Sequence, residues 1–432
     1  WPNAAVDADP AAWRRRGAER CLYGVDISLM AVELAKLSLW LASVARGKPL
    51  SFLDHHLRQG NSLIGARLAD LATVLSGGQR KPTPKERRAR EAGQLSMLDD
   101  PAFSQHVTTA TDLLEHISDR VAETVEDVKA QRADYEQVRA ELEPYRQLAD
   151  LWTARHFGLY LDERQLQTVA RYLVNGAIGS VPKYQQLLTQ TENLVSDHSF
   201  FHWEFEFPQV FFEQDSKAQK DKVGFTVIIG NPPYGAELSS EERDYVELNF
   251  PQSKTNKNTA MLFMELAEHI SLSRWSMILP KSLAFAQVWH NGRVMITPDL
   301  EIAVDVSKAF EDVLLEQMIV VCNVQQGGAS YESPYCGEGT IKPTQLTLPK
   351  KLIESTDSIL LDLNLAELNI LRRILKSSQP LGHISSTFRG LPAQRHLQKT
   401  IGHPTIGGAH IGRYFVRDSQ DYLDISKSSL KK

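Results

Sequence analysis

The sequence has 432 residues, of which 42% are hydrophobic, and its formal net charge at pH 7 is −5. A chain of this length and apolar content can bury a large core and is expected to form two or three units. The negative charge excludes a general attraction to DNA phosphates, so any nucleic-acid surface must be local. Three widely separated cysteines without paired metal-ligand spacing (Cys21, Cys322, Cys336) favour a reducing cytoplasm and argue against a zinc site. No apolar run is long enough to cross a membrane, and because the chain begins at Trp1 we expect it to be part of a longer protein.

The first expected elements are a strand, a helix, a second strand and a loop. A strand over 21–25 ends at Asp26, and Ser28 can cap a helix that is apolar on nearly every side and is therefore expected to be buried. A second strand is predicted over 53–57, before the loop that carries Asn61. An acidic residue at the carboxyl end of a strand in a Rossmann-like unit commonly binds ribose hydroxyls. Asp26 is that candidate, with a helix-capping or turn role as the alternative.

Residues 76–200 do not belong to a minimal Rossmann unit. Their basic run at 80–90 is predicted to be a solvated linker, with phosphate contact as the alternative. Apolar residues spaced by threes and fours from about 109 to 142 predict one helix long enough for a coiled-coil arm, ended by Pro144 or close to it. This insertion could contact partner domains or flanking DNA, or could be structural elaboration. Further helices are expected at 148–174 and 181–194.

Aromatic residues alternate with Glu and His over residues 202–211, which predicts a packed edge segment of the sheet without a catalytic role. The histidines and glutamates here could be imagined as metal ligands. Without a nearby cysteine or a helical His pair, however, we expect no metal site. The side chains concerned are His198, His202, Glu204 and Glu206.

The chain then reaches the sequence Gly-Phe-Thr-Val-Ile-Ile-Gly-Asn-Pro-Pro-Tyr, residues 224–234. Its short apolar, β-branched half predicts a strand buried on both faces of a parallel sheet. The prolines at 232 and 233 cannot donate to a ladder and stiffen the backbone, so Asn231 and Tyr234 are expected on a rigid loop at the carboxyl end of this strand. In open α/β sheets, ligands bind at that edge.

Asn-Pro-Pro-Tyr after such a strand resembles a motif of enzymes that methylate the adenine amine in DNA, and each of its positions has a physical use in the reaction that this resemblance implies. The exocyclic amine of adenine is a poor nucleophile because its lone pair is delocalised, so acceptors must favour the tetrahedral geometry. The side-chain oxygen of Asn231 and the carbonyl oxygen of Pro232 can each accept one N–H. The ring of Tyr234 can stack on a base swung out of the duplex. The loop resembles the catalytic motif of DNA adenine-N6 methyltransferases, and ordinary turn punctuation is the alternative.

Downstream elements complete the predicted sheet. A helix carries Phe263, and strands are expected at 275–279, 300–306 and 317–324, which gives about seven strands in all. From residue 363 the composition changes to one helix, at 365–375, and then a segment rich in Gly, His, Ser and Pro. Four side chains of that segment could meet phosphates or base edges: Arg389, Arg395, His396 and Arg413.

Three segments in this order, Val25-Asp26-Ile27, Gly60-Asn61-Ser62 and Asn231-Pro232-Pro233-Tyr234, resemble the gamma-class DNA adenine methyltransferases. The likeness is greatest to the large methylase polypeptides of restriction-modification and related phage-defence systems. It implies S-adenosylmethionine as the cofactor and a flipped adenine in double-stranded DNA as the substrate. The implied roles are Asp26 on the cofactor ribose, Ile27 and Phe263 on the two faces of its adenine, Asn61 on the adenine edge, Asn231 with Pro232 and Pro233 at the amine, and Tyr234 with Phe310 on the flipped base.

The family's glycine-rich first motif should lie upstream of Asp26, and residues 1–20 contain nothing like it. Because that motif holds the methionine end of the cofactor, this chain by itself is expected to bind the cofactor weakly or not at all. The expected domains are the first part of the methyltransferase core (1–75), a helical insertion (76–200), the second part of the core with the catalytic loop (201–362) and the start of a target-recognition domain (363–432).

The sequence therefore predicts an α/β protein, a Rossmann-like methyltransferase core with a mixed, mostly parallel sheet. Its expected activity is methylation of adenine N6 in DNA, in the cytoplasm, alongside other domains or subunits of a restriction or defence system. Two alternatives stay open. The same loop chemistry methylates guanine N2 in RNA and glutamine amides in proteins, and a chain without its glycine-rich motif could bind DNA or partners without catalysis.

Overall fold

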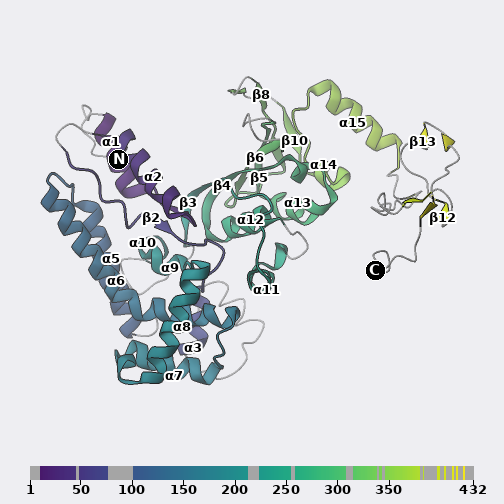
Figure 1. Ribbon diagram of the computed structural model, residues 1–432. Helices are drawn as coiled ribbons and strands as arrows, with labels where there is room; N and C mark the ends of the chain where they lie inside the picture. The colour runs from purple at the N-terminus through teal and green to yellow at the C-terminus, as the bar shows by residue number, and fades with distance from the viewer. Residues whose placement is uncertain are drawn as a thin grey trace. The chain divides into compact units, whose positions relative to one another are not determined.

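The structure is a computed structural model that describes residues 10–44, 48–75, 101–212, 223–253, 258–307, 315–337, 340–342, 346–379, 383 and short strands between 397 and 423. The chain forms two compact units, residues 1–363 and 364–432. Figure 1 traces its helices and strands from the N-terminus to the C-terminus.

The first unit begins with a small parallel strand pair. Its elements are α1 (Pro10–Cys21), β1 (Gly24–Asp26), α2 (Leu29–Ala42) and β2 (Leu57–Gln59). Strand β1 lies parallel to β2, with Asp26 opposite Gln59. The predicted order of strand, helix and strand is confirmed, but both strands begin later than predicted. Cys21 still belongs to α1, and a turn closed by the N–H groups of His56 and Leu57 on the carbonyl of Leu53 precedes β2.

The expectation that α2 is buried is wrong. Ser28 caps the helix as predicted, and its hydroxyl accepts the N–H of Ala31 at 3.4 Å. Val32 is buried against the strands, but Met30 and Leu41 are 68% and 69% exposed. Apolarity on every side indicates burial only where every side has a cover. Within the described residues, only one side of α2 has one.

The centre of the first unit is a six-stranded sheet in the order β10-β7-β5-β6-β4-β3. The strands are β3 (Phe225–Gly230), β4 (Ser271–Pro280), β5 (Leu300–Asp305), β6 (Gln317–Asn323), β7 (Ser330–Glu332) and β10 (Thr347–Pro349). Strand β3 runs parallel to β4 and β5 to β7, whereas the pairs β4–β6, β5–β6 and β7–β10 are antiparallel.

The prediction of a mixed sheet is confirmed, but the sheet is not mostly parallel. Strands β5 and β6 follow each other in the chain and pair antiparallel, since a parallel pair needs a longer crossover between its strands. The sheet also has six described strands instead of about seven, because β1 and β2 pair separately. A further hairpin of β8 (Tyr335–Gly337) and β9 (Thr340–Lys342) stands apart from it. The accompanying helices are α11 (Ser240–Asn249), α12 (Thr259–Ile270), α13 (His290–Ile296) and α14 (Lys351–Thr356).

Strand β3 is the edge strand of this sheet among the described residues, and the prediction that both of its faces are buried is wrong. Val227 is 55% exposed and Ile229 is 84% exposed. The strand pairs with β4 on one side only. A continuous apolar run does not distinguish a central strand from a strand whose second neighbour is absent, which is why the sequence misled here.

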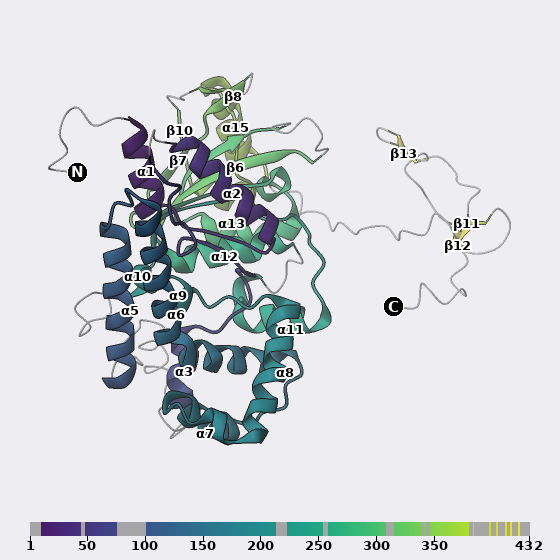
Figure 2. The same cartoon turned by 60° about the vertical axis from the view of Figure 1, so that its left-hand side comes forward.

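The insertion between the two parts of the sheet is helical. It comprises α3 (Leu68–Leu75), α5 (Pro101–Asp119), α6 (Val125–Ala154), α7 (Glu163–Val174) and α8 (Pro182–His198). The predicted single arm is instead an antiparallel hairpin of α5 and α6, which lie side by side in Figures 1 and 2. A capping box of Thr124 and Asp127 starts the second helix, and Pro144 lies inside α6 without ending it.

Residues 202–211, predicted as a packed edge segment of the sheet, form two single helical turns, α9 (Trp203–Glu206) and α10 (Pro208–Phe211). Pro208 is the first residue of the second turn, where its missing N–H costs nothing. Phe205, Phe207 and Phe211 are all buried in the core that the insertion shares with the sheet. Alternation of aromatics therefore reflected burial without indicating a strand.

The second unit begins with α15 (Leu365–Ser377), which confirms the predicted helix; Asn364 and Glu367 form its capping box. Five two-residue strands follow in two small groups, β11-β15-β12 and β13-β14. They are β11 (Leu397–Gln398), β12 (His403–Pro404), β13 (Ile411–Gly412), β14 (Phe415–Val416) and β15 (Tyr422–Leu423). The four predicted contact residues Arg389, Arg395, His396 and Arg413 lie outside the described residues.

Two adjacent histidines, His55 and His56, are buried where β2 meets the insertion, with ring centroids 4.1 Å apart. Burial lowers the pKa of His56 to about 4 and holds the pKa of His55 well below its usual range. Between pH 6.5 and pH 4 the unfolded chain therefore binds more protons than the folded chain. The stability that the two neutral histidines contribute is complete above their pKa in the unfolded chain. It is lost as the pH falls toward and through their lower pKa in the folded chain.

We expect the free energy of unfolding to fall by up to about 3 kcal/mol for His56 between pH 6.5 and pH 4. Urea unfolding at a series of pH values measures this dependence. His56→Phe keeps a ring of similar size without a titrating nitrogen, so its acid slope should be shallower. An identical slope in both proteins would contradict the assignment.

Candidate active site

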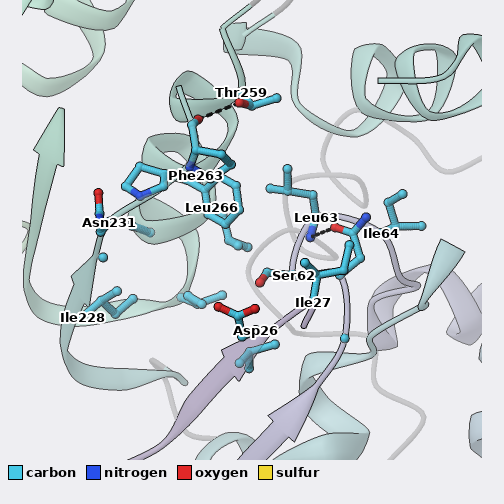
Figure 3. A pocket seen from close by; sticks show the side chains of 18 of the residues that line it. Asp26, Ile27, Ser62, Leu63, Ile64, Ile228, Asn231, Thr259, Phe263 and Leu266 are labelled. Atoms are coloured by element: carbon cyan, nitrogen blue, oxygen red, sulfur yellow. Dashed lines mark hydrogen bonds between the residues drawn. The ribbon is translucent and has the colours of Figure 1, made fainter. Parts of the chain in front are cut away.

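A hollow of about 830 Å³ lies between the carboxyl ends of β1 and β3 and is closed on a third side by α12. Figure 3 looks into it: Asp26 stands at one side, Asn231 at another, and Phe263 and Leu266 lie between them. Seven of the nine predicted site residues line this hollow: Asp26, Ile27, Asn61, Asn231, Pro232, Pro233 and Phe263. They come from segments more than two hundred residues apart in the chain.

Asp26 ends β1, and its side chain projects into the hollow (Figure 3). One carboxylate oxygen, Oδ1, accepts the N–H of Ser28 at 2.7 Å, so the residue has the turn role that was its alternative. No bond to the second oxygen occurs among the described residues. Asp26 can therefore both fix the start of α2 and accept hydrogen bonds from a ligand.

The loop after β2 carries Asn61 to the rim of the hollow. The Asn61 side-chain oxygen accepts the N–H of Leu63 at 3.1 Å, and its backbone N–H donates to the carbonyl of Ser199 at 2.7 Å. These two bonds fix the backbone conformation of the loop and the orientation of the Asn61 amide group. The Asn61 side-chain NH₂ group has no hydrogen-bond partner in the described part of the chain, and the residue lines the hollow.

The insertion supports this loop through residues that the sequence analysis did not identify. Phe200 forms a parallel bridge with Asn61, and the Trp203 indole donates to the carbonyl of Ser62 at 3.0 Å. The approach is so close that a Cβ at Gly60 would lie 2.4 Å from the ring of Phe201. The glycine in Gly60-Asn61-Ser62 was the available signal, since glycine allows a second backbone to come near.

His202 joins the same loop to helix α6. Its Nδ1 accepts the N–H of Ala66 at 3.0 Å, so its Nε2 carries the proton and donates to Asp150 at 2.9 Å. Each of the four side chains once considered as metal ligands has a polar partner: Asp150 for His202, Glu242 for His198, the N–H of Leu68 for Glu204, and Arg58 for Glu206. Within the described residues, no group of three potential ligands converges as a metal site.

Glu206 is buried between two arginines. Its carboxylate meets Arg58 of β2 at 2.7 Å and Arg146 of α6 at 3.2 Å. Burial acts to raise the pKa of Glu206, but Arg146 and Arg58 outweigh it and hold that pKa below its ordinary value. This ion triad ties the strand before the Asn61 loop to the helical insertion.

The Asn231-Pro232-Pro233-Tyr234 loop leaves β3 at the carboxyl end of the strand, where the sequence placed it. Asn231 is exposed and Pro232 is buried. Gly235 follows with φ +76°, a conformation that side chains rarely adopt. The loop is therefore stiff before the tyrosine and turns sharply after it.

Phe263 lies one turn inside α12, partly buried, while its helix neighbours Leu262 and Met264 are fully packed. Its ring borders the hollow together with Ile27 and Asp26. Asp26 and Phe263 thus offer a polar edge and a flat apolar face to one ligand.

The two residues expected to clamp a flipped base have different outcomes. Tyr234 is half-buried, its hydroxyl has no hydrogen-bond partner among the described residues, and burial raises its pKa. Phe310 lies outside the described residues. The sandwich of Tyr234 and Phe310 stays a prediction.

The chain that builds this hollow belongs to the Eco57I restriction-modification methylase family, whose model matches residues 20–293. Over 267 residues it is 26% identical to a protein of Methanocaldococcus jannaschii described as a type II restriction enzyme and methyltransferase. That match covers 52% of this chain and 19% of the relative, so the chain spans about a fifth of that protein's length.

Among solved structures, the chain is similar to a modification subunit of a type I restriction enzyme from Vibrio vulnificus (14% identity, 61% of each chain, TM-score 0.23). It is also similar to the type I restriction-modification methyltransferase subunit of Streptococcus thermophilus (11% identity, 71% of this chain and 77% of that one, TM-score 0.24). Scores this low do not establish a shared fold. None of the described helices is long and apolar enough to span a membrane.

Proposed function

We propose that this chain is the catalytic part of a DNA methyltransferase that transfers a methyl group from S-adenosylmethionine to N6 of adenine. The observation that carries the proposal is the position of the Asn231–Tyr234 loop, which borders the same hollow as Asp26 and Phe263. Other domains or subunits of a restriction or defence system would recognise the target sequence in the DNA.

The residues of the hollow fit the cofactor's adenosine part. Asp26 has a carboxylate oxygen available for ribose hydroxyls, and Ile27 and Phe263 offer apolar faces to a purine. Asn61 lies where a base edge would be read. When bound, this cofactor supplies an electrophilic methyl group on sulfur.

The catalytic loop acts on the amine that attacks this methyl group. The Asn231 side-chain oxygen and the Pro232 carbonyl oxygen each accept one N–H of the amine, which favours the tetrahedral nitrogen that forms only in the transition state. No group of the loop needs a shifted pKa for this step. Tyr234 offers its ring to the base that has left the stack.

Analysis of the methylated product tests the proposal. The full-length protein is incubated with radiolabelled S-adenosylmethionine and, separately, unmethylated DNA, RNA and a cell protein extract. We expect N6-methyladenine in DNA. Label in guanine of RNA or in glutamine of protein would support the alternative substrates, and the absence of label would support a binding function.

We expect Asp26→Ala to weaken S-adenosylmethionine binding by about 10- to 100-fold, the usual effect of losing hydrogen bonds to a charged group. Calorimetry on the full-length protein measures the dissociation constant. Ser28→Ala is the matched control, because it removes the cap of α2 and leaves the carboxylate in place. Equal losses in both variants would assign Asp26 to helix capping alone.

Tyr234→Ala should reduce methylation of an adenine in an A·T pair more than of an adenine opposite a mismatch. A mismatched base is easier to extrude, so it depends less on a stacking face worth about 1–3 kcal/mol. Tyr234→Phe keeps that face and should behave like the parent protein. Equal losses on both duplexes would exclude a stacking role.

A further inference from the structure

Thr259, the first residue of α12, joins the two ends of the turn that carries Tyr234. Its hydroxyl donates to the carbonyl oxygen of Pro233 at 2.7 Å and accepts the N–H of Ala236 at 3.2 Å. The Thr259 side chain is only 2% exposed, so water competes poorly for these bonds. Figure 3 shows the residue at the start of the helix, bonded to the loop.

Tyr234 and Gly235 form a bend between Pro233 and Ala236. Gly235 has φ +76°, the value that a type II turn needs at its third position. In a closed turn the N–H of Ala236 would donate directly to the carbonyl of Pro233. That bond is absent from the backbone hydrogen bonds of the described segments, and the Thr259 hydroxyl stands between the two groups instead. The direction of Tyr234, the second residue of the turn, therefore depends on a side chain from another element.

We propose that Thr259 is a positioning residue for methyl transfer, an inference that rests on the proposed function. Its hydroxyl holds the loop in the conformation in which the acceptor oxygens of Asn231 and Pro232 and the ring of Tyr234 can all contact the same base. Thr259 also lies four residues before Phe263, hence on the same side of α12. Helix α12 thereby positions the loop that would contact the base and also carries the ring that would contact the cofactor.

Threonine suits this position because the bridge needs a donor and an acceptor on one atom. A hydroxyl offers both, whereas the methyl group that replaces it in valine offers neither. Thr259→Val keeps the size and branching of the side chain and removes only the bridge. Thr259→Ser keeps the bridge and removes only a methyl group.

Two measurements test the proposal. Hydrogen exchange of peptides covering residues 230–238 should accelerate at least about tenfold in Thr259→Val and stay near the parent rate in Thr259→Ser. In the full-length protein, Thr259→Val should lower kcat by about 10- to 100-fold while KM for S-adenosylmethionine and for unmethylated DNA changes less than about threefold. Thr259→Ser should retain most of kcat.

Thr153→Val is the matched control. Thr153 is also buried and helical, but its hydroxyl donates within α6, to the carbonyl of Ala149, and does not touch the loop. Unchanged exchange or unchanged kcat in Thr259→Val would overturn the proposal. So would a loss that Thr259→Ser fails to restore, or one that Thr153→Val reproduces, since either would mark Thr259 as ordinary packing. If the parent protein transfers no methyl group, the proposed function fails, and the exchange experiment still decides whether the hydroxyl holds the loop.

Discussion

Asn231→Ala is expected to lower the rate of methyl transfer by 10²–10³-fold or more, on the order seen when one transition-state hydrogen bond is removed from other enzymes. Affinity for duplex DNA should stay within about threefold, because phosphate contacts elsewhere supply most of it. Single-turnover transfer of a radiolabelled methyl group and a DNA-binding isotherm, both on the full-length protein, measure the two quantities.

Asn231→Asp is the matched variant, because it keeps an acceptor oxygen at the same position. We expect it to retain more activity than Asn231→Ala. Activity of the alanine variant close to that of the parent would remove the central claim about this loop. A parallel loss of DNA binding would indicate that the loop had collapsed.

The second large effect is expected at Glu206. Glu206→Gln should lower the free energy of unfolding by about 3 kcal/mol, because it removes the buried carboxylate that pairs with the largely buried Arg58 and leaves Arg146 with only the half-exposed Glu143. Urea unfolding measures the loss. Because Arg58 belongs to β2, the Asn61 loop that follows should also become more susceptible to proteolysis.

Glu143→Gln is the control for that experiment. Glu143 also meets Arg146, at 3.3 Å, but its side chain is nearly half exposed. A solvated pair of this kind contributes about 0–1 kcal/mol. If the two variants lost the same stability, burial would not be the reason for the effect at Glu206.

Much of the sheet could be predicted because its strands are bounded by sharp signals. Strand β3 stops at Pro232 and Pro233, and α12 and β4 follow clear helical and apolar patterns. The loop that divides the predicted single helix into α5 and α6 was harder to predict. A capping box at Thr124 starts α6, within a run whose spacing by threes and fours predicted one continuous helix from about 109 to 142.

Pro144 shows why a local rule can fail. Proline removes one helical hydrogen bond, but Leu142, Tyr145 and Leu148 around it are buried in the shared core. Tertiary packing therefore carries α6 through the proline. The same holds for Phe205, which is buried against Phe103 of α5, a hundred residues away in the chain.

The site was predictable only where one residue carries a recognisable chemistry. Asp26, Asn61 and Asn231 can be proposed from their positions after strands. His202 and Thr259 could not, because each acts through a hydrogen bond to a backbone group of a distant segment. Such bonds leave no spacing pattern in the sequence.

The exposed edge of β3 has a practical consequence for handling this chain. Within the described residues β3 pairs on one side only, and an edge strand with side chains as apolar as Val227 and Ile229 is a template for pairing with another chain. The exposed side of α2, with Met30 and Leu41, is a second apolar surface through which copies of the chain could associate. Self-association is therefore the expected behaviour of the isolated chain at high concentration, and its ligand affinities are meaningful only when measured well below the concentration at which aggregates form.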